Sequence, residues 1–421
     1  MPNRRRGWFP AGSKSMKAVT QLVADIKSRY SDLLDPDYPR FSDSEMARRE
    51  GLVADMIAAH SLDALIAAEA MRAGTATGWI TGWPVTAEAV TLIIPGAARR
   101  MFIQHFNHLP LARRVAQDTE VLWGEAGALG LAAEAVRKAR AGKARVGVIG
   151  RLPVAQAGML SGMFEVIDMN RAYTQVRLVK SDEELRWLEL AADLTDLAVT
   201  ALAEGAKPGM SERELQALVQ TPYLPFGATN FIHYFQTASM TASDSAVPRQ
   251  YPSGRKLEKG DVLSTELSVD YWGYTGQVLR TFFIGEEPNA LYRELHAVAD
   301  AVLDRILDRI RPGIHVRDLA AASSQIENSG FTIIDDLIHG YGGGYLPPVL
   351  GSQSRPAAGE IPDMTLSSGM ALVIQPNVVT RDWKAGVQTG NLVVVTDTGV
   401  RPLQKFPRGF RIIGLEKSDL L

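Results

Sequence analysis

Two segments in the second half of the chain show the same break between helices. The first reads Lys207-Pro208-Gly209, with Ser211 and Glu214-Leu215 after it; the second reads Arg311-Pro312-Gly313, with Asp318-Leu319 after it. Pro-Gly ends a helix, and a capping or acidic residue close behind it begins the next one. We therefore predict that this half is built from a duplicated unit of two helices plus strands.

The composition is that of an ordinary globular protein. The 421 residues include 45 Lys plus Arg and 47 Asp plus Glu, for a formal net charge of -2, and 46% of them are hydrophobic. This balance offers no basic surface to a nucleic-acid backbone, so we expect no nucleic-acid partner. The sequence has no cysteine, which excludes disulfides, thiolate metal sites and Cys nucleophiles.

The sequence predicts neither a membrane segment nor a secretory signal. The apolar run Val90 to Ile94 is stopped by Pro95-Gly96, far short of the ~20 residues that a membrane helix needs. The basic start, Met1 to Trp8, is not followed by an apolar core. We expect no membrane partner and a cytoplasmic location.

The first part of the chain alternates helical and strand-like patterns, which is typical of an α/β domain. The predicted elements are helices over Ser42 to His60 and Glu125 to Ala141, and strands over Leu62 to Ala67, Val90 to Ile94, Met101 to Gln104 and Arg145 to Gly150. Ser181 with Glu184 forms a capping box that starts a long helix ending near Ala206. We therefore divide the chain into domains 1–177 and 178–421.

Four further strands are predicted in the second domain. They cover Asp261 to Asp270, Arg280 to Ile284, Met370 to Ile374 and Leu392 to Thr396. Long helical segments separate them, which favours an α+β core curved around a central site.

Three stretches carry polar residues on otherwise apolar strands. They are Lys259 to Gly285, Ile338 to Gly342, and Gly369 to Leu392. In their order and spacing, over about residues 180 to 405, they resemble the C-terminal domain of the creatinase, prolidase and methionine-aminopeptidase family. That resemblance implies a pita-bread fold, preceded by a smaller α/β domain of the type found in creatinase and aminopeptidase P.

The resemblance also shows where this sequence departs from the family. Family peptidases hold two divalent cations through two Asp, one His and two Glu, and these positions fall on Glu266, Gln277, His339, Gln375 and Gly390. Hard cations need anionic oxygen ligands, and two such ions sit only ~3.5 to 4 Å apart. A single Glu cannot offset their repulsion, so we predict no dinuclear metal site and no cofactor.

Two further positions separate the chain from creatinase itself. The family's catalytic His before Pro-Ser-Asp falls on Arg249, and creatinase's catalytic Glu falls on Leu279. Ectoine hydrolase resembles the chain more closely, through Glu266, Tyr345 to Pro348 and Thr396 to Gly399. The resemblance therefore points to a metal-free branch that includes these two enzymes.

Glu266 and His339 are the candidate catalytic residues. A carboxylate on an apolar strand is costly to bury, and burial raises its pKa toward that of a general acid or base. The alternative for Glu266 is an ion pair with Arg280. His339 would donate to an oxyanion or move protons, or it is a structural histidine.

The other candidate residues would bind substrate. Gln277 and Gln375 offer neutral amides, which form hydrogen bonds but cannot abstract protons. Arg249 suits bidentate capture of a carboxylate, although a surface loop position is the alternative. Trp272, Tyr274 and Tyr345 would line an aromatic pocket, or else pack in the core.

The leading hypothesis is a metal-independent hydrolase that cleaves a C–N bond in a small polar nitrogen compound. The alternatives are a lyase acting on a small zwitterion, a metal-dependent Xaa-Pro aminopeptidase, and an inactive peptidase-like binding protein. Family members with two domains are commonly homodimers, so we expect a small-molecule substrate and a homodimer.

Overall fold

The computed structural model describes residues 16–71, 74–125, 127–357 and 360–414. These residues form two compact units, one from Asp32 to Leu185 and the other from the described residues up to Ser31 and from Arg186 onward. The first unit therefore ends some eight residues beyond the predicted boundary at 177, and the earliest described residues belong to the second unit. Within the described residues, no helix is long and apolar enough to cross a membrane.

The unit from Asp32 to Leu185 contains a mixed six-stranded sheet in the order β4-β3-β2-β1-β5-β6. Its strands are β1 Ala64–Glu69, β2 Ala89–Ile93, β3 Arg100–Ile103, β4 Glu120–Trp123, β5 Arg145–Ile149 and β6 Glu165–Asp168. Its helices are α3 Asp43–Ala59, α4 Ala76–Thr81, α5 Leu109–Val115, α6 Ala128–Ala139, α7 Val154–Met163 and α8 Asn170–Val176, and the short α2 Ser31–Leu34 lies at its start. The predicted helices and strands of the α/β pattern are confirmed within about three residues at each end.

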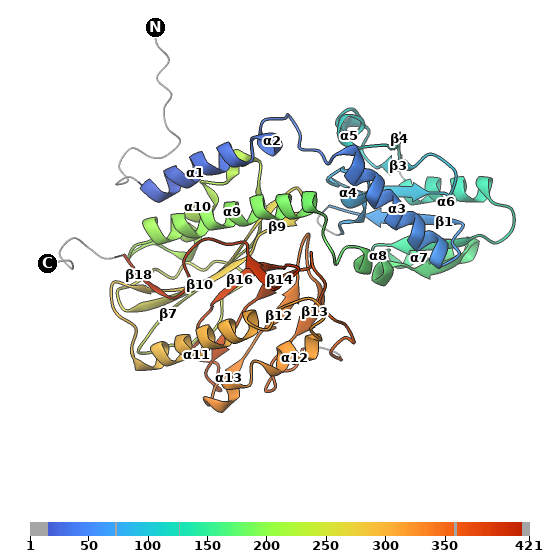
Figure 1. The fold of residues 1–421 in the computed structure, drawn as a ribbon. Helices are drawn as coiled ribbons and strands as arrows, with labels where there is room; N and C mark the ends of the chain where they lie inside the picture. The colour runs from blue at the N-terminus through green and yellow to red at the C-terminus, as the bar shows by residue number, and fades with distance from the viewer. Residues whose placement is uncertain (1–15, 72–73, 126, 358–359, 415–421) are drawn as a thin grey trace, which may run out of the picture. The chain divides into compact units, whose positions relative to one another are not determined.

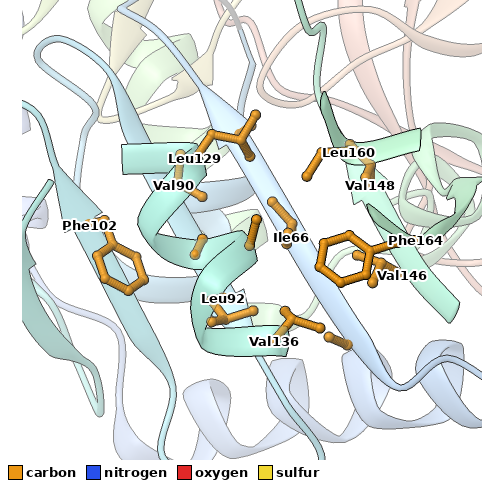
Figure 2. Packing of buried hydrophobic residues seen from close by; sticks show 14 of the residues in the cluster. Ile66, Val90, Leu92, Phe102, Leu129, Val136, Val146, Val148, Leu160 and Phe164 are labelled. Carbon is orange, nitrogen blue, oxygen red and sulfur yellow. The ribbon is translucent and has the colours of Figure 1, made fainter. Parts of the chain in front are cut away.

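The unit has two apolar cores, one on each face of its sheet, because successive side chains of the central strands point to opposite faces. Ile66, Val90 and Leu92 face α6, where Leu129 and Val136 pack against them, as Figure 2 shows. The neighbouring positions of β1 point to the other face of the sheet, against α3, α4 and α8. Because side-chain direction alternates every residue along a strand, apolar residues at successive positions form two layers, one on each side of a single sheet.

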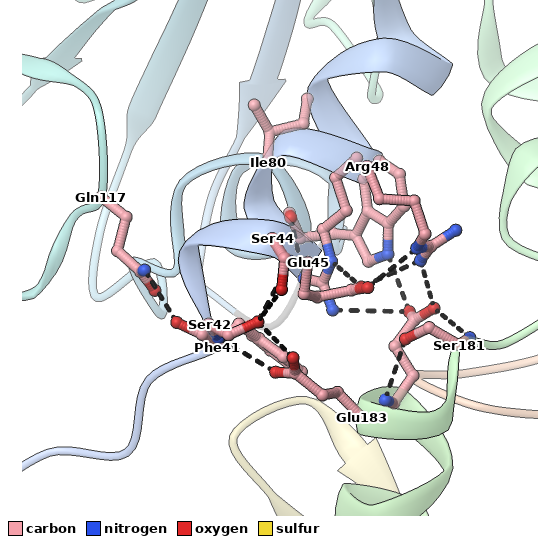
Figure 3. Close-up of polar contacts among 12 residues, drawn as sticks. Phe41, Ser42, Ser44, Glu45, Arg48, Ile80, Gln117, Ser181 and Glu183 are labelled. Atoms are coloured by element: carbon pink, nitrogen blue, oxygen red, sulfur yellow. Dashed lines mark hydrogen bonds and ion pairs between the residues drawn. The ribbon is translucent and has the colours of Figure 1, made fainter.

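A buried ionic network ties the start of α3 to residues near position 184 (Figure 3). The hydroxyl of Ser42 accepts a hydrogen bond from the backbone N–H of Glu45 and caps α3. Arg48 and Arg49 donate to Glu45 at 2.8 and 2.7 Å, and Arg48 also donates to Glu184 at 2.8 Å. Burial alone would raise the pKa of Glu45, but its hydrogen bonds to the two arginines bring that pKa below its ordinary value.

The second unit is built around a ten-stranded sheet whose main path is β13-β12-β14-β16-β10-β8-β7. These strands are β7 Thr229–Ser239, β8 Asp261–Tyr271, β10 Val278–Ile284, β12 Ile338–Gly340, β13 Leu346–Leu350, β14 Ala371–Ile374 and β16 Gly390–Val395. Three short strands lie off this path: β9 Tyr274–Thr275 pairs with β8, β17 Val400–Pro402 with β16, and β18 Arg411–Ile413 with β10. A separate pair is formed by β11 Thr332–Ile333 and β15 Val378–Val379. The four predicted strands correspond to β8, β10, β14 and β16.

Helices cover this sheet, and the longest, α9 and α11, run beside its strands in Figure 1. The helices are α1 Lys17–Arg29, α9 Asp182–Gly205, α10 Glu212–Gln220, α11 Ala290–Leu307, α12 Val316–Ala321 and α13 Gln325–Asn328, with 3-10 turns at Phe106–His108 in the first unit and Leu224–Phe226 here. The predicted capping box at the start of α9 is confirmed, because the Glu184 carboxylate accepts from the backbone N–H of Ser181 at 3.1 Å and the Ser181 hydroxyl accepts from that of Glu184 at 3.2 Å. Helix α1, which the sequence analysis did not predict, lies along α9, and Tyr30 after it donates to Asp193 at 2.9 Å.

The predicted internal repeat is present in the backbone. The N–H of Gly209 donates to Leu257 O at 2.8 Å, and the N–H of Gly313 donates to Leu366 O at the same distance. Both glycines have positive φ values, 88° and 82°, which only glycine adopts without strain. Each Pro-Gly turn thus docks on the segment that leads into a central strand, β8 in one copy and β14 in the other.

We predict that Arg49→Met lowers the stability of the first unit by about 3 to 5 kcal/mol, because it leaves buried Glu45 and Glu184 with less compensating charge. Thermal unfolding monitored by circular dichroism measures the change. Arg137→Met is the matched control, since Arg137 pairs with Glu134 on an exposed helix face and its loss should leave the midpoint nearly unchanged. Equal shifts in the two variants would contradict the prediction.

Candidate active site

Glu266 lies in the middle of β8, opposite Leu279 of β10 and Tyr234 of β7. Its expected partner Arg280 is opposite Thr265, one residue earlier, and therefore points to the other face of the sheet. The guanidinium of Arg280 instead donates to Gly390 O at 2.7 Å and to other acceptors on its own face. The alternative interpretation of Glu266 as an ion-pair partner of Arg280 is thus wrong.

The carboxyl of Glu266 is buried and has no cationic partner among its described contacts. Gln277 Nε2 donates to its Oε1 at 2.7 Å. Burial, with a smaller contribution from the charge of Asp335, raises the pKa of Glu266 to about 8. The group therefore carries a proton through most of the neutral range and can release it just above that range.

Gln277 and Gln375 meet beside Glu266. Gln277 directly precedes β10 and Gln375 directly follows β14, and Gln277 Nε2 lies 3.4 Å from Gln375 Oε1. Gln375 Nε2 donates to the backbone O of Asp336 at 3.2 Å. Within the described part of the chain, Gln277 Oε1 is buried with no hydrogen-bond partner, so it can accept from a bound molecule.

His339 lies on β12, next to β14, and is fully buried. Burial lowers its pKa to about 4, so the ring is neutral at pH 7. Nδ1 lies 3.1 Å from Gly340 O, which can only accept, so the ring proton sits on Nδ1. In that tautomer Nε2 is an acceptor; no hydrogen bond to it is found among the described residues, and the side chain of Gln375 lies beside the ring.

Two acidic residues that the sequence analysis missed lie at the same place. Asp335 and Asp336 precede β12, and their signal in the sequence is an acidic pair close before His339. Burial, followed by the charges of Asp335 and Glu266, raises the pKa of Asp336 to about 8. Its Oδ2 is buried without a hydrogen-bond partner in the described structure. The site thus holds two carboxyl groups that keep a proton near neutral pH.

Of the remaining predicted substrate-binding residues, Tyr345 contacts the Glu266 cluster, whereas Arg249, Tyr274 and Trp272 have other contacts. The ring of Tyr345 stacks on that of His339 with centroids 4.0 Å apart. Arg249 instead forms a 2.8 Å ion pair with the buried Glu212 of α10. Tyr274 packs on a core tryptophan, and Trp272 occupies the turn between β8 and β9 with a φ of 52°.

Gly390, the fifth family position, offers no ligand. A Cβ at this residue would lie 2.6 Å from Ile374 O and 3.0 Å from Gln375 Cα, because β14 and β16 approach closely here. Among the residues that the structure describes, no three His, Cys, Asp or Glu side chains converge in a geometry that could hold a metal ion. The donor set, with one carboxylate, one imidazole and two amides at the family positions, therefore does not fit a centre of two divalent cations.

Comparison with known proteins identifies the family. The model for "Metallopeptidase family M24" matches residues 186–397, half of the chain, and this range contains the whole Glu266 cluster. The chain belongs to metallopeptidase family M24. Its relatives include the Xaa-Pro dipeptidases of Pyrococcus furiosus, 27% identical over 236 residues, and of Pyrococcus horikoshii, 26% identical over 234 residues. Each match covers 55% of this chain and less than two thirds of the relative, 65% and 64%.

Solved structures support the fold. The X-Pro aminopeptidase from Thermotoga maritima superimposes with a TM-score of 0.75 at 20% identity, covering 87% of this chain and 99% of that one. The prolidase from Pyrococcus furiosus gives a TM-score of 0.71 at 20% identity, covering 84% and 99%. The predicted α+β pita-bread fold is confirmed.

The leading functional hypothesis from the sequence is wrong. The two Pyrococcus relatives are named Xaa-Pro dipeptidase, which favours a peptidase over a creatinase-like hydrolase of small nitrogen compounds. Similarity over more than 200 residues outweighs the residue types at five positions. The Xaa-Pro peptidase that the sequence analysis kept as an alternative agrees better with these relatives.

We predict that Gly390→Ala destabilises the second unit by about 1 to 3 kcal/mol, because the added methyl group overpacks the β14–β16 contact. Thermal unfolding provides the measurement. Gly399→Ala is the control, since the nearest atom to its new Cβ is 4.0 Å away. A Gly390→Ala midpoint equal to that of the control would show that the strands can separate without cost.

We also predict that Glu266→Gln is more stable than the parent protein at pH 8 but not at pH 5. The folded-state pKa of about 8 lies above the ordinary value of 4.5, so the parent loses stability as pH rises between these values. The uncharged amide avoids this loss, which amounts to as much as about 4 kcal/mol. Melting curves of both proteins with a chelator present test the prediction, and a pH-independent difference would contradict it.

Proposed function

We propose that this protein hydrolyses the peptide bond of dipeptides in which proline is the second residue. The observation that carries the proposal is the family match over residues 186–397, together with relatives named Xaa-Pro dipeptidase. The proposal does not depend on the two-ion ligand set, which the residues at the family positions do not supply. The experiment below therefore measures whether the activity requires a metal ion.

The buried acceptors of the site suit a ligand with several N–H donors. Gln277 Oε1, His339 Nε2 and Asp336 Oδ2 have no partner among the described residues. A buried acceptor left unpaired costs free energy, and a donor from a bound molecule removes that cost. The α-ammonium group of a short peptide offers three such donors.

The carboxyl groups of the site can supply a proton. Hydrolysis of a peptide bond requires a proton on the leaving nitrogen. Glu266 and Asp336 have pKa values raised to about 8, so one of them can hold this proton at neutral pH and donate it. We assign this role to Glu266, because Gln277 fixes the position of its carboxyl.

Incubation of the purified full chain with Ala-Pro, Leu-Pro and Met-Pro, and with Ala-Ala for comparison, tests the proposal by the release of free proline. The reactions are run after chelation and again with Mn(II), Co(II) or Zn(II). We expect proline release in at least one condition, reduced at least about 100-fold by Glu266→Gln. Glu134→Gln, on the exposed face of α6, is the matched control and should keep full activity.

The outcomes separate the alternatives. No proline release in any condition from folded protein would overturn the proposed activity. Release that Glu266→Gln leaves unchanged would keep the activity and remove the assigned role of Glu266.

A further inference from the structure

A cavity of about 360 Å³ lies in the unit from Asp32 to Leu185, on the α3 side of its sheet. It opens between the exposed face of α3 and the turn that joins β2 to β3. All of its lining residues fall between positions 49 and 99, so it is separate from the Glu266 cluster. Its size is within the range of small-molecule sites, ~300 to 1,000 Å³.

Most of the cavity wall is apolar, and its polar side chains are those of Arg49, Glu50, Ser61 and Arg99. Val53 and Ile57 of α3, Leu62, Ile80 of α4, and Ile93 at the end of β2 contribute aliphatic side chains. All but Ile93 are buried. Ala54 and Ala58 form the exposed rim on α3.

One wall carries a buried cation. Arg99 is 9% exposed, and its guanidinium donates to Ile80 O. In the described part of the chain its anionic contact is Glu50, at 3.6 Å, and the Glu50 side chain is 68% exposed. Burial lowers the pKa of Arg99, although the charges of Glu50 and Asp118 act in the opposite direction.

The second arginine of the cavity differs from Arg99 in its partners. Arg49 donates to Glu45 at 2.7 Å and to Trp79 O at 2.9 Å, and it stacks 3.8 Å above the ring of Phe41. Its charge is thus already engaged in the network of Figure 3. Arg99 is therefore the group that a bound anion would meet.

We propose that this cavity binds a small monocarboxylic acid with an apolar body. The carboxylate pairs with Arg99, in place of its long contact to Glu50, and the apolar body fills the space between α3 and Ile93. A guanidinium prefers carboxylates because two N–H groups can meet both oxygens. The aliphatic side chains of the wall cannot form hydrogen bonds with the body of a polar acid. The positive charge of Arg99 repels a protonated amine.

Isothermal titration calorimetry with decanoate, decanol and decylamine, each below its micelle or solubility limit, tests the proposal on the full chain. We expect decanoate to bind, decanol to bind at least 10-fold more weakly, and decylamine to give no heat of binding. Ala54→Trp places a large side chain over the opening from an exposed position, and it should abolish decanoate binding without disturbing the core.

Variants of the cation complete the test. Arg99→Met should weaken decanoate binding at least 10-fold while leaving decanol binding unchanged, and Arg99→Lys should retain part of the preference for decanoate. Arg137→Met, a distant exposed arginine, is the control and should bind like the parent. If Arg99→Met fails to fold, Ala54→Trp and the comparison of the three ligands still decide the question.

Three results would overturn the proposal. The first is equal binding of decanoate and decanol to the parent protein. The second is decanoate binding that Ala54→Trp leaves unchanged. The third is absence of decanoate binding to the parent protein. A dimer that Ala54→Trp dissociates in sedimentation experiments would then make this surface a contact between copies of the chain. None of these measurements depends on peptidase activity.

Discussion

The antiparallel ladder through β8, β10, β16, β14 and β12 is the constraint on which the site depends. Its register places Glu266 opposite Leu279 and Leu279 opposite Gly390, and so brings residues more than 100 positions apart into contact. Arg280 holds this ladder from the other face, where its guanidinium donates to Gly390 O and to Asn391 Oδ1 at 2.7 and 2.8 Å. Arg280 belongs to β10 and these two acceptors belong to β16. It therefore fixes the spacing of these two strands, because each lost bond would leave a buried acceptor unpaired.

Electrostatics of the site follow from this packing. Glu266 and Asp336 are buried with no cation among their described neighbours, and burial raises the pKa of each. The same burial keeps His339 neutral and leaves its Nε2 as an acceptor. A site with protonated carboxyls and unpaired acceptors is prepared to receive N–H groups, which agrees with a peptide ligand. It differs from the usual M24 donor set at Gln277, Gln375 and Gly390, and the close approach of β14 and β16 makes a side chain at Gly390 costly.

The two units present different chemistry. In the second unit, polar groups converge inside a curved sheet built from a duplicated motif. In the first unit, an apolar cavity has one undercompensated cation, Arg99, while its neighbour Arg49 is fully used in holding α3. The contrast between these arginines shows why burial by itself does not indicate a binding site. The partners of each guanidinium decide whether it stabilises the fold or remains available to a ligand.

The sequence by itself determined the elements and much of the architecture. Local signals were enough for this: the Pro-Gly turns at 208 and 312, the Ser181–Glu184 capping box and the period-two strands each act over a few residues, and the structure confirms them. The sequence also selected Glu266, Gln277, His339, Gln375 and Tyr345, which the structure brings together. Only the tertiary structure decided that Asp335 and Asp336 join them, that Arg249 is held by Glu212, and that Arg280 faces away from Glu266. These facts depend on strand register and on burial between distant segments, which residue types and their spacing along the chain do not specify.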